Sequence, residues 1–430
     1  MQRLKVLISA YACRPGEGSE PGIGWEIARE MAKHHQIWVL TRENNRPAIT
    51  AELKKHPDIP LRVIFYDLPG SRIWRRGQGG VHLHYYLWQI GAYFAARQLH
   101  QTVQFDLVHH ITYVRYAAPS FLSLLPIPFL WGPVGGGESA PQSFWKEFGW
   151  RARIYEGLRN AARWLGEHDP FVRMTARRSV LTWATTSDTA DRLQTLQARN
   201  IQVLSQLGLS DLEISQLAQP CSRQEPPIRF ISIGRLLHWK GFHLGLRAFA
   251  HADLPDSAEY WILGEGPEKL PLQKLAQELG IAHQIKFWGK QPRDEVLKHL
   301  KNCLALIHPS LHESGGMVCS EAMAAGIPVI CLDLGGPAVQ VTPETGFKIP
   351  AHNPEQAVQG LAQAMTTLAQ NPDLRRSLGL SGQQRVRDLF RWSVKGQELA
   401  NLYETVLKQS RYQAASLNPV QDGYPREDIG

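Results

Sequence analysis

The stretch HESGGMVCSEAMAAGIPVI, residues 312–330, comes shortly after the apolar run CLALIHP and ends inside a second one, IPVICLD. Two short apolar runs separated by a loop and an Ala-rich segment predict a strand, a loop, a helix from about Cys319–Ser320 and another strand. Strands joined through a helix run parallel, so the stretch predicts one unit of an α/β fold. It also carries Glu313 and Glu321 on either side of a glycine pair, which a purely structural helix does not require.

The same alternation of short apolar runs and amphipathic segments continues along the chain. Seven runs from LKVLISA to IQVLS, and five from IRFISIG to IPVICLD, predict buried parallel strands because they are continuous in Val, Ile and Leu. At 430 residues the chain is long enough for two domains. Helices are expected at 22–35, 82–100, 113–124 and 150–166, and throughout the region after residue 352.

Composition indicates a globular protein, with 43% hydrophobic and 20% charged residues. The sequence contains no run of about 18 apolar residues, so it predicts no membrane span. The short apolar run at the N-terminus suits a first strand better than a signal peptide. The five cysteines show no paired spacing, which argues against a disulfide framework and fits a reducing cytoplasm. Pro309 separates His308 from His312, so we interpret both as loop residues and expect no metal site there.

The net charge of +8 is unevenly distributed. Residues 1–200 hold 25 Lys/Arg and 16 Asp/Glu, a balance of +9, whereas residues 201–430 hold 22 and 23, a balance of −1. Segments 71–99 and 145–166 combine basic with aromatic residues, which suits the interface of an anionic bilayer. The alternative is a helix packed on its own sheet with a wet outer face. Nucleic acid is disfavoured as a partner because no binding motif occurs and half of the chain carries no excess charge.

The second of these segments is amphipathic. Its expected apolar face contains Trp150, Ile154, Leu158, Ala162 and Leu165, and away from that face lie Arg151, Arg159 and Arg163.

The loop at 313–316 and the helix after it suit an anion. Glycines let backbone N–H groups approach a ligand closely, and a helix N-terminus adds a positive partial charge, so a phosphate is the simplest ligand. Glu321, expected in the first helical turn, can accept hydrogen bonds from the vicinal hydroxyls of a ribose, and Glu313 from those of a second sugar. The alternative is that the glutamates only stabilise the helix start and the turn before it.

A basic pair follows the first strand of the same half, in SIGRLLHWKGFHLGLRAF, residues 232–249. Gly234 leaves room beside the strand end, and Arg235 and Lys240 are spaced to reach into the cleft. A diphosphate leaving group requires positive charge that is already in place when its own negative charge develops. The alternative is an ordinary solvated basic face.

Five motifs stand in order between residues 228 and 350: GRLLHWKG (234–241), LGEGPEKLPLQKLAQELG (263–280), IKFWGK (285–290), HPSLHESGGMVCSEAMAAGIPVI (308–330) and DLGGPAVQV (333–341). This set resembles glycosyltransferase family 4, the retaining nucleotide-sugar transferases of the GT-B fold. The resemblance implies an α/β protein of two Rossmann-like, doubly wound domains that face each other across a cleft, with the C-terminal helix crossing back. We place the parts at 1–205 (acceptor-binding domain), 206–227 (linker), 228–390 (donor-binding domain), 391–411 (crossover helix) and 412–430 (disordered tail).

The resemblance also implies roles for residues of the donor side. Arg235 and Lys240 would bind the donor pyrophosphate, Glu321 the ribose and Glu313 the donor sugar. The complete set of donor-site candidates is Gly234, Arg235, Lys240, Lys290, Glu313, Ser314, Gly315, Gly316, Met317, Val318 and Glu321. The family commonly has an aromatic residue where this chain has Gly315, a departure that affects the fit of the sugar.

The N-terminal half is similar to a bacterial branch of the same family through YACRPGEGSEPGIGW (11–25) and HHITYVR…WGPVGGGE (109–138). We expect an open glycine-rich loop after the first strand, and its spacing is not GxGxxG, which disfavours a nicotinamide cofactor. The candidates for the acceptor side of the cleft are Gly16, Gly18, Glu20, Gly22, Gly135 and Gly136, with Gly24 in the same loop.

The candidate catalytic residues are Arg235, Lys240, Glu313 and His110. His110 ends the run FDLVHH, where it or His109 would contact the donor sugar or relay a proton. Many relatives carry a histidine after the next strand, where this chain has WGP, so that role cannot be carried over.

No Asp-x-Asp occurs, so we expect neither a metal nor another cofactor. The resemblance implies transfer of a hexose from a UDP- or GDP-linked donor to a glycan or lipid-linked acceptor in envelope or exopolysaccharide synthesis. The expected location is the cytoplasm, including the inner face of the plasma membrane. Two alternatives stay open: a soluble transferase that acts on a free sugar or sugar phosphate, and a non-catalytic protein that binds a nucleotide sugar.

Overall fold

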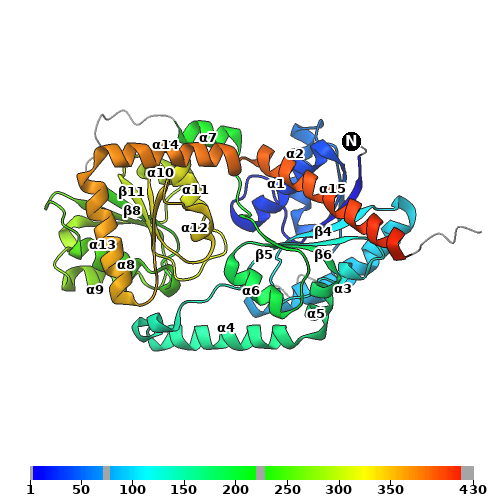
Figure 1. Ribbon diagram of the computed structural model, residues 1–430, viewed down its shortest axis with the longest axis horizontal. Helices are drawn as coiled ribbons and strands as arrows, with labels where there is room; N and C mark the ends of the chain where they lie inside the picture. The colour runs from blue at the N-terminus through cyan, green and yellow to red at the C-terminus, as the bar shows by residue number, and fades with distance from the viewer. Residues whose placement is uncertain (1–2, 71–77, 219–227, 418–430) are drawn as a thin grey trace, which may run out of the picture.

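The computed structural model describes residues 3–70, 78–218 and 228–417, which form two parallel β-sheets covered by helices (Figure 1). The first sheet has the order β3-β2-β1-β4-β5-β6-β7 and the second β10-β9-β8-β11-β12-β13. The strands of the first sheet are β1 (Lys5–Ala10), β2 (Gln36–Thr41), β3 (Leu61–Phe65), β4 (Leu107–Thr112), β5 (Phe129–Val134), β6 (Ser179–Ala184) and β7 (Ile201–Val203). Those of the second are β8 (Arg229–Ile233), β9 (Glu259–Leu263), β10 (Ile285–Gly289), β11 (Ala305–His308), β12 (Val329–Leu332) and β13 (Gly346–Ile349).

The helices connect consecutive strands and cover both faces of each sheet. In the first half they are α1 (Ser19–His34), α2 (Arg46–Lys55), α3 (Gln78–Val103), α4 (Trp150–His168), α5 (Pro170–Arg178) and α6 (Ser187–Thr195). In the second half they are α7 (Asp211–Leu217), α8 (Phe242–His251), α9 (Lys269–Glu278), α10 (Arg293–Lys301), α11 (Met317–Ala324), α12 (Gly335–Gln340), α13 (Pro354–Gln370), α14 (Pro372–Leu389) and α15 (Trp392–Leu417). All strand pairs are parallel, so the predicted pair of doubly wound, Rossmann-like sheets is confirmed.

Successive side chains of β1 show why its run is apolar throughout. Val6 and Ile8 pack with α1 and α15 in one hydrophobic cluster, whereas Leu7 packs with α3 in another. A strand in a doubly wound sheet is buried on both faces, so it has no polar alternation. The runs that predicted the other strands follow the same rule, and each of the twelve coincides with a strand.

Helix α15 crosses back to the first domain, as predicted. Figure 1 shows α14 over the second sheet and α15 across the first. Trp392 and Tyr403 belong to the hydrophobic cluster of β1 and α1, and the Tyr403 hydroxyl lies 2.7 Å from Nδ1 of His109. The helix continues to Leu417, beyond the predicted end at 411; residues 418–430 lie outside the described part of the chain.

A short segment of the first half is part of the core of the second. Phe144 and Phe148, in and next to the 3-10 helix η3 (Gln142–Glu147), are buried in one hydrophobic cluster with Phe230 of β8 and Phe242 of α8. Glu147 also accepts a hydrogen bond from Arg247 of α8 at 2.5 Å. The chain therefore passes to the second domain before it returns to the first along α4, below the two sheets in Figure 1.

Two local predictions in the first half are wrong. Residues 113–124 form only the 3-10 helix η2 (Phe121–Leu124), since Tyr113 has a positive φ of 57° and Arg115 bridges to Gly135. The glycine-rich stretch is only partly a loop, because α1 begins at Ser19 and contains Gly22 and Gly24. A Cβ at Gly24 would lie 2.4 Å from the carbonyl oxygen of Ala12, so glycine there permits close packing of the helix.

No helix in the described part of the chain is both long and apolar enough to cross a membrane. The basic residues of 71–77, part of the predicted linker (219–227) and Cys221 lie outside that part.

The burial of Phe144 predicts that Phe144→Ala lowers the free energy of unfolding of the second domain by about 3–5 kcal/mol, because a large aromatic ring leaves a cavity. The measurement is denaturant-induced unfolding, with Phe171→Ala as the control since that ring is 45% exposed. Equal stability of the two variants would mean that η3 is not part of the second core.

Candidate functional site

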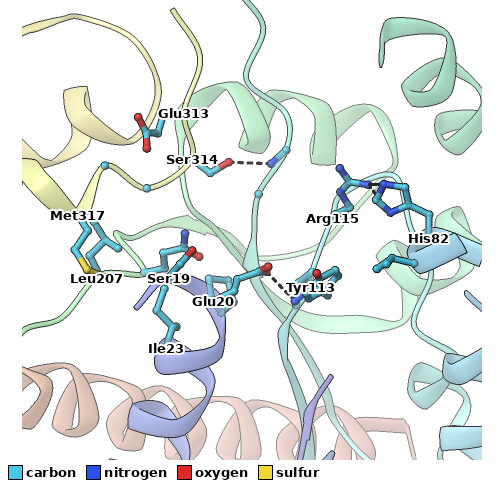
Figure 2. A pocket seen from close by; sticks show the side chains of 18 residues that line it. Ser19, Glu20, Ile23, His82, Tyr113, Arg115, Leu207, Glu313, Ser314 and Met317 are labelled. Atoms are coloured by element: carbon cyan, nitrogen blue, oxygen red, sulfur yellow. Dashed lines mark hydrogen bonds between the residues drawn. The ribbon is translucent and has the colours of Figure 1, made fainter. Parts of the chain in front are cut away.

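A cavity of about 660 Å³ lies where the carboxyl ends of the two sheets face each other. Its walls come from the start of α1, the start of α3, the segments after β4, β5 and β7, and the loop between β11 and α11. The lining residues are Ser19, Glu20, Ile23, Val81, His82, Tyr113, Val114, Arg115, Pro133, Gly135, Gly136, Gln206, Leu207 and residues 313–317. Figure 2 shows Glu313 and Ser314 on one side of this cavity and Arg115 with His82 on the other. Ligands of open α/β sheets bind at such strand ends.

Glu313 is the central charged group of the wall that the second domain provides. Its Oε2 lies 2.6 Å from Nζ of Lys240 and 2.8 Å from Nε2 of His308. Burial alone would raise the pKa of Glu313, but Lys240 and His308 together hold it below its usual range. The carboxylate is therefore ionised at neutral pH and acts as a hydrogen-bond acceptor.

The loop after Glu313 presents an uncapped helix to the cavity. Gly316 is the N-cap of α11 with a φ of 89°, and no side chain bonds to the free N–H groups of the first turn. The Gln340 side-chain amide donates to the carbonyl oxygen of Gly315 at 2.7 Å and to that of Gly316 at 3.3 Å. Because the carbonyl groups are held by Gln340, the positive end of α11 is left for a ligand.

Glu321 lies deeper than expected. Helix α11 begins at Met317, two residues before the predicted start, which places Glu321 in its second turn. Its Oε1 forms an ion pair of 2.7 Å with Arg293 of α10, and Arg293 also pairs with Glu213 of α7 at 2.9 Å. Burial raises the pKa of Glu321, and Arg293 acts against that rise.

A second cavity, of about 250 Å³, adjoins the first and shares Ser19, Ile23 and Met317 with it. Gly16, Gly18 and Gly22 line it from the first domain, and Glu213 and Arg293 from the second. The two glutamates of the quoted stretch therefore belong to different cavities. Glu313 lines the large one, and Glu321 approaches the small one through Arg293.

On the first-domain wall, Glu20 and Arg115 are the charged groups. Glu20 accepts a hydrogen bond of 2.8 Å from the backbone N–H of Tyr113, and burial raises its pKa. Nη1 of Arg115 lies 3.2 Å from Nδ1 of His82 (Figure 2), whose pKa is lowered by burial and by the Arg115 charge. This wall therefore offers a guanidinium and a carboxyl group to a ligand that Glu313 faces from the other side.

The two walls are tied together by the buried carboxylate of Glu138. Ser314 donates to Glu138 at 2.6 Å, and the N–H of Gly136 lies 3.2 Å from Oγ of Ser314. Glu138 also accepts hydrogen bonds from Thr186 at 2.7 Å and Thr189 at 2.9 Å. Ser314 is thus held by the first domain although the second domain carries it.

A second buried carboxylate, Glu156 of α4, holds the loops that carry Lys240 and Glu313. Its Oε1 lies 3.0 Å from Nε2 of His238 and 3.1 Å from Nε2 of His312. Burial alone would raise the pKa of Glu156, yet the two histidines and Arg159, at 3.3 Å, hold it below its usual range. His312, in turn, has a lowered pKa because it is buried.

The structure brings many of the predicted residues together. Those that line one of the two cavities are Gly16, Gly18, Glu20, Gly22, Gly135, Gly136, Glu313, Ser314, Gly315, Gly316 and Met317. Lys240 reaches the large cavity through its ion pair with Glu313, and Gly234 lies next to Lys240. Arg235 and Lys290 are exposed, and neither they nor Val318 line these cavities.

His110 does not line either cavity. It is buried against Tyr85 and Gln89 of α3 at 3.4 Å each, and burial lowers its pKa to about 4. His109 is held between Tyr403 and the carbonyl oxygen of Gly132, at 2.7 Å each, and burial lowers its pKa to about 3. Both rings are interior groups of the first domain that are neutral at physiological pH.

Several residues that shape the site were missed from the sequence. His308 was interpreted as a loop residue, but it ends β11, and its position at a strand end was the available signal. Four further residues hold the site through contacts between segments far apart in the chain, and no local pattern reveals such contacts. They are Arg293, Gln340, Glu138 and Glu156. No group of three or more His, Cys, Asp or Glu suited to a metal occurs in the described residues.

In sequence, the second half of the chain is similar to glycosyl transferases. Residues 216–385 match the family model Glycosyl transferases group 1. The D-inositol 3-phosphate glycosyltransferase of Corynebacterium diphtheriae is 30% identical over 179 residues, 40% of this chain and 41% of that protein. The lipopolysaccharide core biosynthesis glycosyltransferase LpsD of Rhizobium meliloti is 31% identical over 178 residues, 40% of this chain and 50% of that protein. The alignments thus span no more than half of either relative.

Structural comparison covers nearly the whole chain. Sucrose-phosphate synthase of Thermosynechococcus elongatus superposes with a TM-score of 0.60 at 17% identity, over 95% of this chain and all of that one. HepE of Anabaena in complex with UDP superposes with a TM-score of 0.59 at 17% identity, over 94% of this chain and all of that one. The architecture is therefore the GT-B fold, with two Rossmann-like domains.

The partners of Glu156 predict a pH-dependent stability. Glu156→Gln should lower the free energy of unfolding by about 1.5–3 kcal/mol at pH 7, the scale of hydrogen bonds to a charged group. Because the folded pKa of Glu156 lies below its unfolded value, its contribution is complete at neutral pH and is lost as the pH falls below about 5. The variant should therefore differ most from the parent near pH 7 and least in acid.

Denaturant-induced unfolding at pH 7 and pH 4 measures both effects. Glu278→Gln is the matched control, since that carboxylate is exposed on α9 and pairs with the neighbouring Lys274. A constant difference between the Glu156 variant and the parent at both pH values would contradict the assignment.

Proposed function

We propose that the protein is a retaining glycosyltransferase that moves a hexose from a UDP- or GDP-linked donor to a glycan or lipid-linked acceptor. The observation that carries the proposal is the Glu313 carboxylate, held ionised by Lys240 and His308 beside the uncapped N-terminus of α11. The match of residues 216–385 to glycosyl transferases group 1 supports the reaction class. HepE, of the same fold, was solved with UDP and with UDP-glucose, which supports a nucleotide-sugar donor.

In the proposed complex the donor extends over both cavities. The sugar lies in the large cavity, where Glu313 accepts hydrogen bonds from its hydroxyls. The diphosphate lies at the α11 N-terminus, near Lys240. The ribose lies toward Glu321, whose carboxylate turns from Arg293 to the vicinal hydroxyls or shares them with it.

The proposed reaction requires no covalent bond to the protein. The bond between the anomeric carbon and the diphosphate oxygen breaks, and the acceptor oxygen bonds to that carbon on the same face. The acceptor proton passes to the departing diphosphate, whose growing negative charge is stabilised by Lys240, the α11 dipole and Arg235. Arg235 is exposed and lines neither cavity, so in the proposed complex its side chain turns toward the donor. Lys240 is preorganised for this role by Glu313. His110 has no part in this scheme, because it is buried away from both cavities.

We also propose that transfer is independent of metal, since these groups supply positive charge at the site of the leaving group. Synthesis of envelope polysaccharide is the proposed context, supported by the named role of LpsD in lipopolysaccharide core biosynthesis.

A phosphorylated acceptor is the second candidate. Arg115, with His82 beside it, supplies positive charge on the first-domain wall, opposite Glu313, where a sugar phosphate would be held with its hydroxyl toward the donor. A relative named for D-inositol 3-phosphate supports this alternative.

The first test is calorimetric titration with UDP, GDP, ADP and NAD, each in EDTA. We expect one of the three nucleoside diphosphates to bind without metal and NAD not to bind. Glu321→Ala should weaken that binding by about 1.5–3 kcal/mol, because a hydrogen bond between a carboxylate and the ribose is lost. Glu295→Ala, which removes an exposed carboxylate of α10, is the control. Unchanged affinity of the Glu321 variant would remove it from the ribose site.

The second test is product formation. A variant with Arg235→Ala and Lys240→Ala should lose transfer while it keeps its fold, because the charge that stabilises the leaving group is gone. Circular dichroism checks the fold, and Lys274→Ala, which removes an exposed lysine of α9, is the control. Turnover that survived in the double variant would mean that other groups stabilise the diphosphate.

A further inference from the structure

Helix α4 is turned with its polar side toward the protein and its apolar side toward solvent. Glu156 and Arg163 are its buried residues, although both are charged. Five large apolar residues on the opposite side are between 54% and 67% exposed: Trp150, Ile154, Leu158, Trp164 and Leu165. An amphipathic helix on a globular protein normally has the reverse orientation. The sequence left two alternatives open for this helix, contact with a bilayer and packing on its own sheet. Neither included a buried arginine of the helix.

The inner face fixes this orientation. Glu156 bonds to His238 and His312, and Arg159 donates to the carbonyl oxygen of Glu138 at 2.6 Å. Arg163 donates to Oγ of Ser139 at 2.5 Å and also to the carbonyl oxygens of Gly136 and Glu138. Rotation of α4 to bury its apolar side would carry these charged groups to solvent and cover the carbonyl oxygens of Gly136 and Glu138 with apolar side chains, which is costly because buried acceptors would lose their donors. The apolar side is therefore exposed as a consequence of the fold.

The exposed surface continues beyond α4. Phe171, at the start of α5, contacts Phe121 with ring centroids 5.2 Å apart, and Phe121 contacts Tyr86 of α3 at 5.9 Å. On α3, exposed Leu83, Ile90 and Phe94 follow at helical spacing. We call Trp150, Ile154, Leu158, Trp164, Leu165 and Phe171 the α4 apolar surface. Figure 1 shows α4, α5 and α3 following one another along the lower side of the molecule.

Positive charge surrounds this surface. Arg151 and Arg153 are exposed and stand at opposite edges of the apolar side of α4. Apart from the inward-facing Glu156, Arg159 and Arg163, residues 145–178 contain 6 Lys/Arg and 3 Asp/Glu, a balance of +3. Trp150 and Trp164 stand toward the two ends of the helix, and tryptophan favours the boundary between lipid and water.

We propose that the α4 apolar surface docks on an anionic lipid bilayer, with α4 lying in the plane of the interface. The combination of apolar side chains with surrounding arginines is what such an interface binds. A second copy of the chain fits less well, because it would bring two positively charged faces together.

Docking in this way would place the large cavity at the lipid surface. Val81 and His82 line the cavity, and the next residue, Leu83, is exposed on α3, whose Tyr86 donates a hydrogen bond to Asp169 at the end of α4. A lipid-linked acceptor could enter the cavity from the bilayer along this part of α3. This last step rests on the proposed function, whereas the docking itself does not.

The test is co-sedimentation of the full chain with vesicles of phosphatidylcholine alone and of phosphatidylcholine with about one quarter phosphatidylglycerol. We expect binding to the anionic vesicles that weakens with salt and is at least about tenfold stronger than to the neutral ones. The variant Leu158→Gln with Leu165→Gln should bind at least about tenfold more weakly. The control is Leu270→Gln with Leu380→Gln, since these leucines are 76% and 60% exposed on the second half.

Three results would overturn the proposal: no binding of the parent to anionic vesicles, equal binding of the two variants, or equal binding to neutral and anionic vesicles. Light scattering adds a fourth, a dimer that dissociates in the Leu158 and Leu165 variant, which would identify a second copy as the occupant. Titration of the same samples with UDP and GDP separates the two proposals. Loss of vesicle binding with nucleotide binding retained concerns only docking, and the opposite pattern counts only against the donor site.

Discussion

The buried carboxylate of Glu156 is the interaction on which the arrangement of this molecule depends. A carboxylate removed from water must keep its hydrogen-bond partners, and here they are two histidines that stand on separate loops of the second domain. His238 is two residues from Lys240, and His312 directly precedes Glu313. The geometry of the basic and acidic groups at the cavity is therefore tied to a helix of the first half of the chain.

The same interaction determines what α4 shows to solvent. The two faces of an amphipathic helix point in opposite directions. Because Glu156, Arg159 and Arg163 face the protein, the tryptophan, leucine and isoleucine residues of the opposite face are exposed to solvent. Stability at the inner side comes from charge-assisted hydrogen bonds in place of hydrophobic burial. The cavity and the exposed surface thus have one physical origin, although they lie on different sides of α4.

The sheets could be predicted from sequence because each buried strand shows a local pattern. Continuous runs such as KVLISA in β1 have no other compatible environment. The short β13, GFKI, was missed because its exposed Lys348 and its glycine interrupt the run. Gly22 and Gly24 were assigned both to the open loop and to the helix expected at 22–35, and only the helix is correct; the close packing that requires glycine there depends on the carbonyl groups of Glu17 and Ala12. The orientation of α4 could not be predicted either, since periodicity defines two faces without stating which one is inside.

For the site, sequence predicted the loop and its two glutamates but not what holds them. Glu313 and Ser314 stand on one short motif, whereas their partners Lys240 and Glu138 come from positions 73 and 176 residues away. Arg293 is placed against Glu321 only when α10 packs beside α11. Such pairings depend on the folded sheets, so the local sequence carries no sign of them.

The position of η3 limits where the two domains can be separated or exchanged by protein engineering. Phe144 and Phe148 complete the core of the second domain, yet they are encoded upstream of the linker. The chain consequently crosses between the domains near residue 140, again along α4, near residue 206 and at α15, so its modules are interlaced and not arranged in series. A chimera that exchanges second domains among related chains at the linker alone would separate this aromatic pair from its own pocket. A chimera that folds correctly must therefore transfer residues 140–148 together with the second domain.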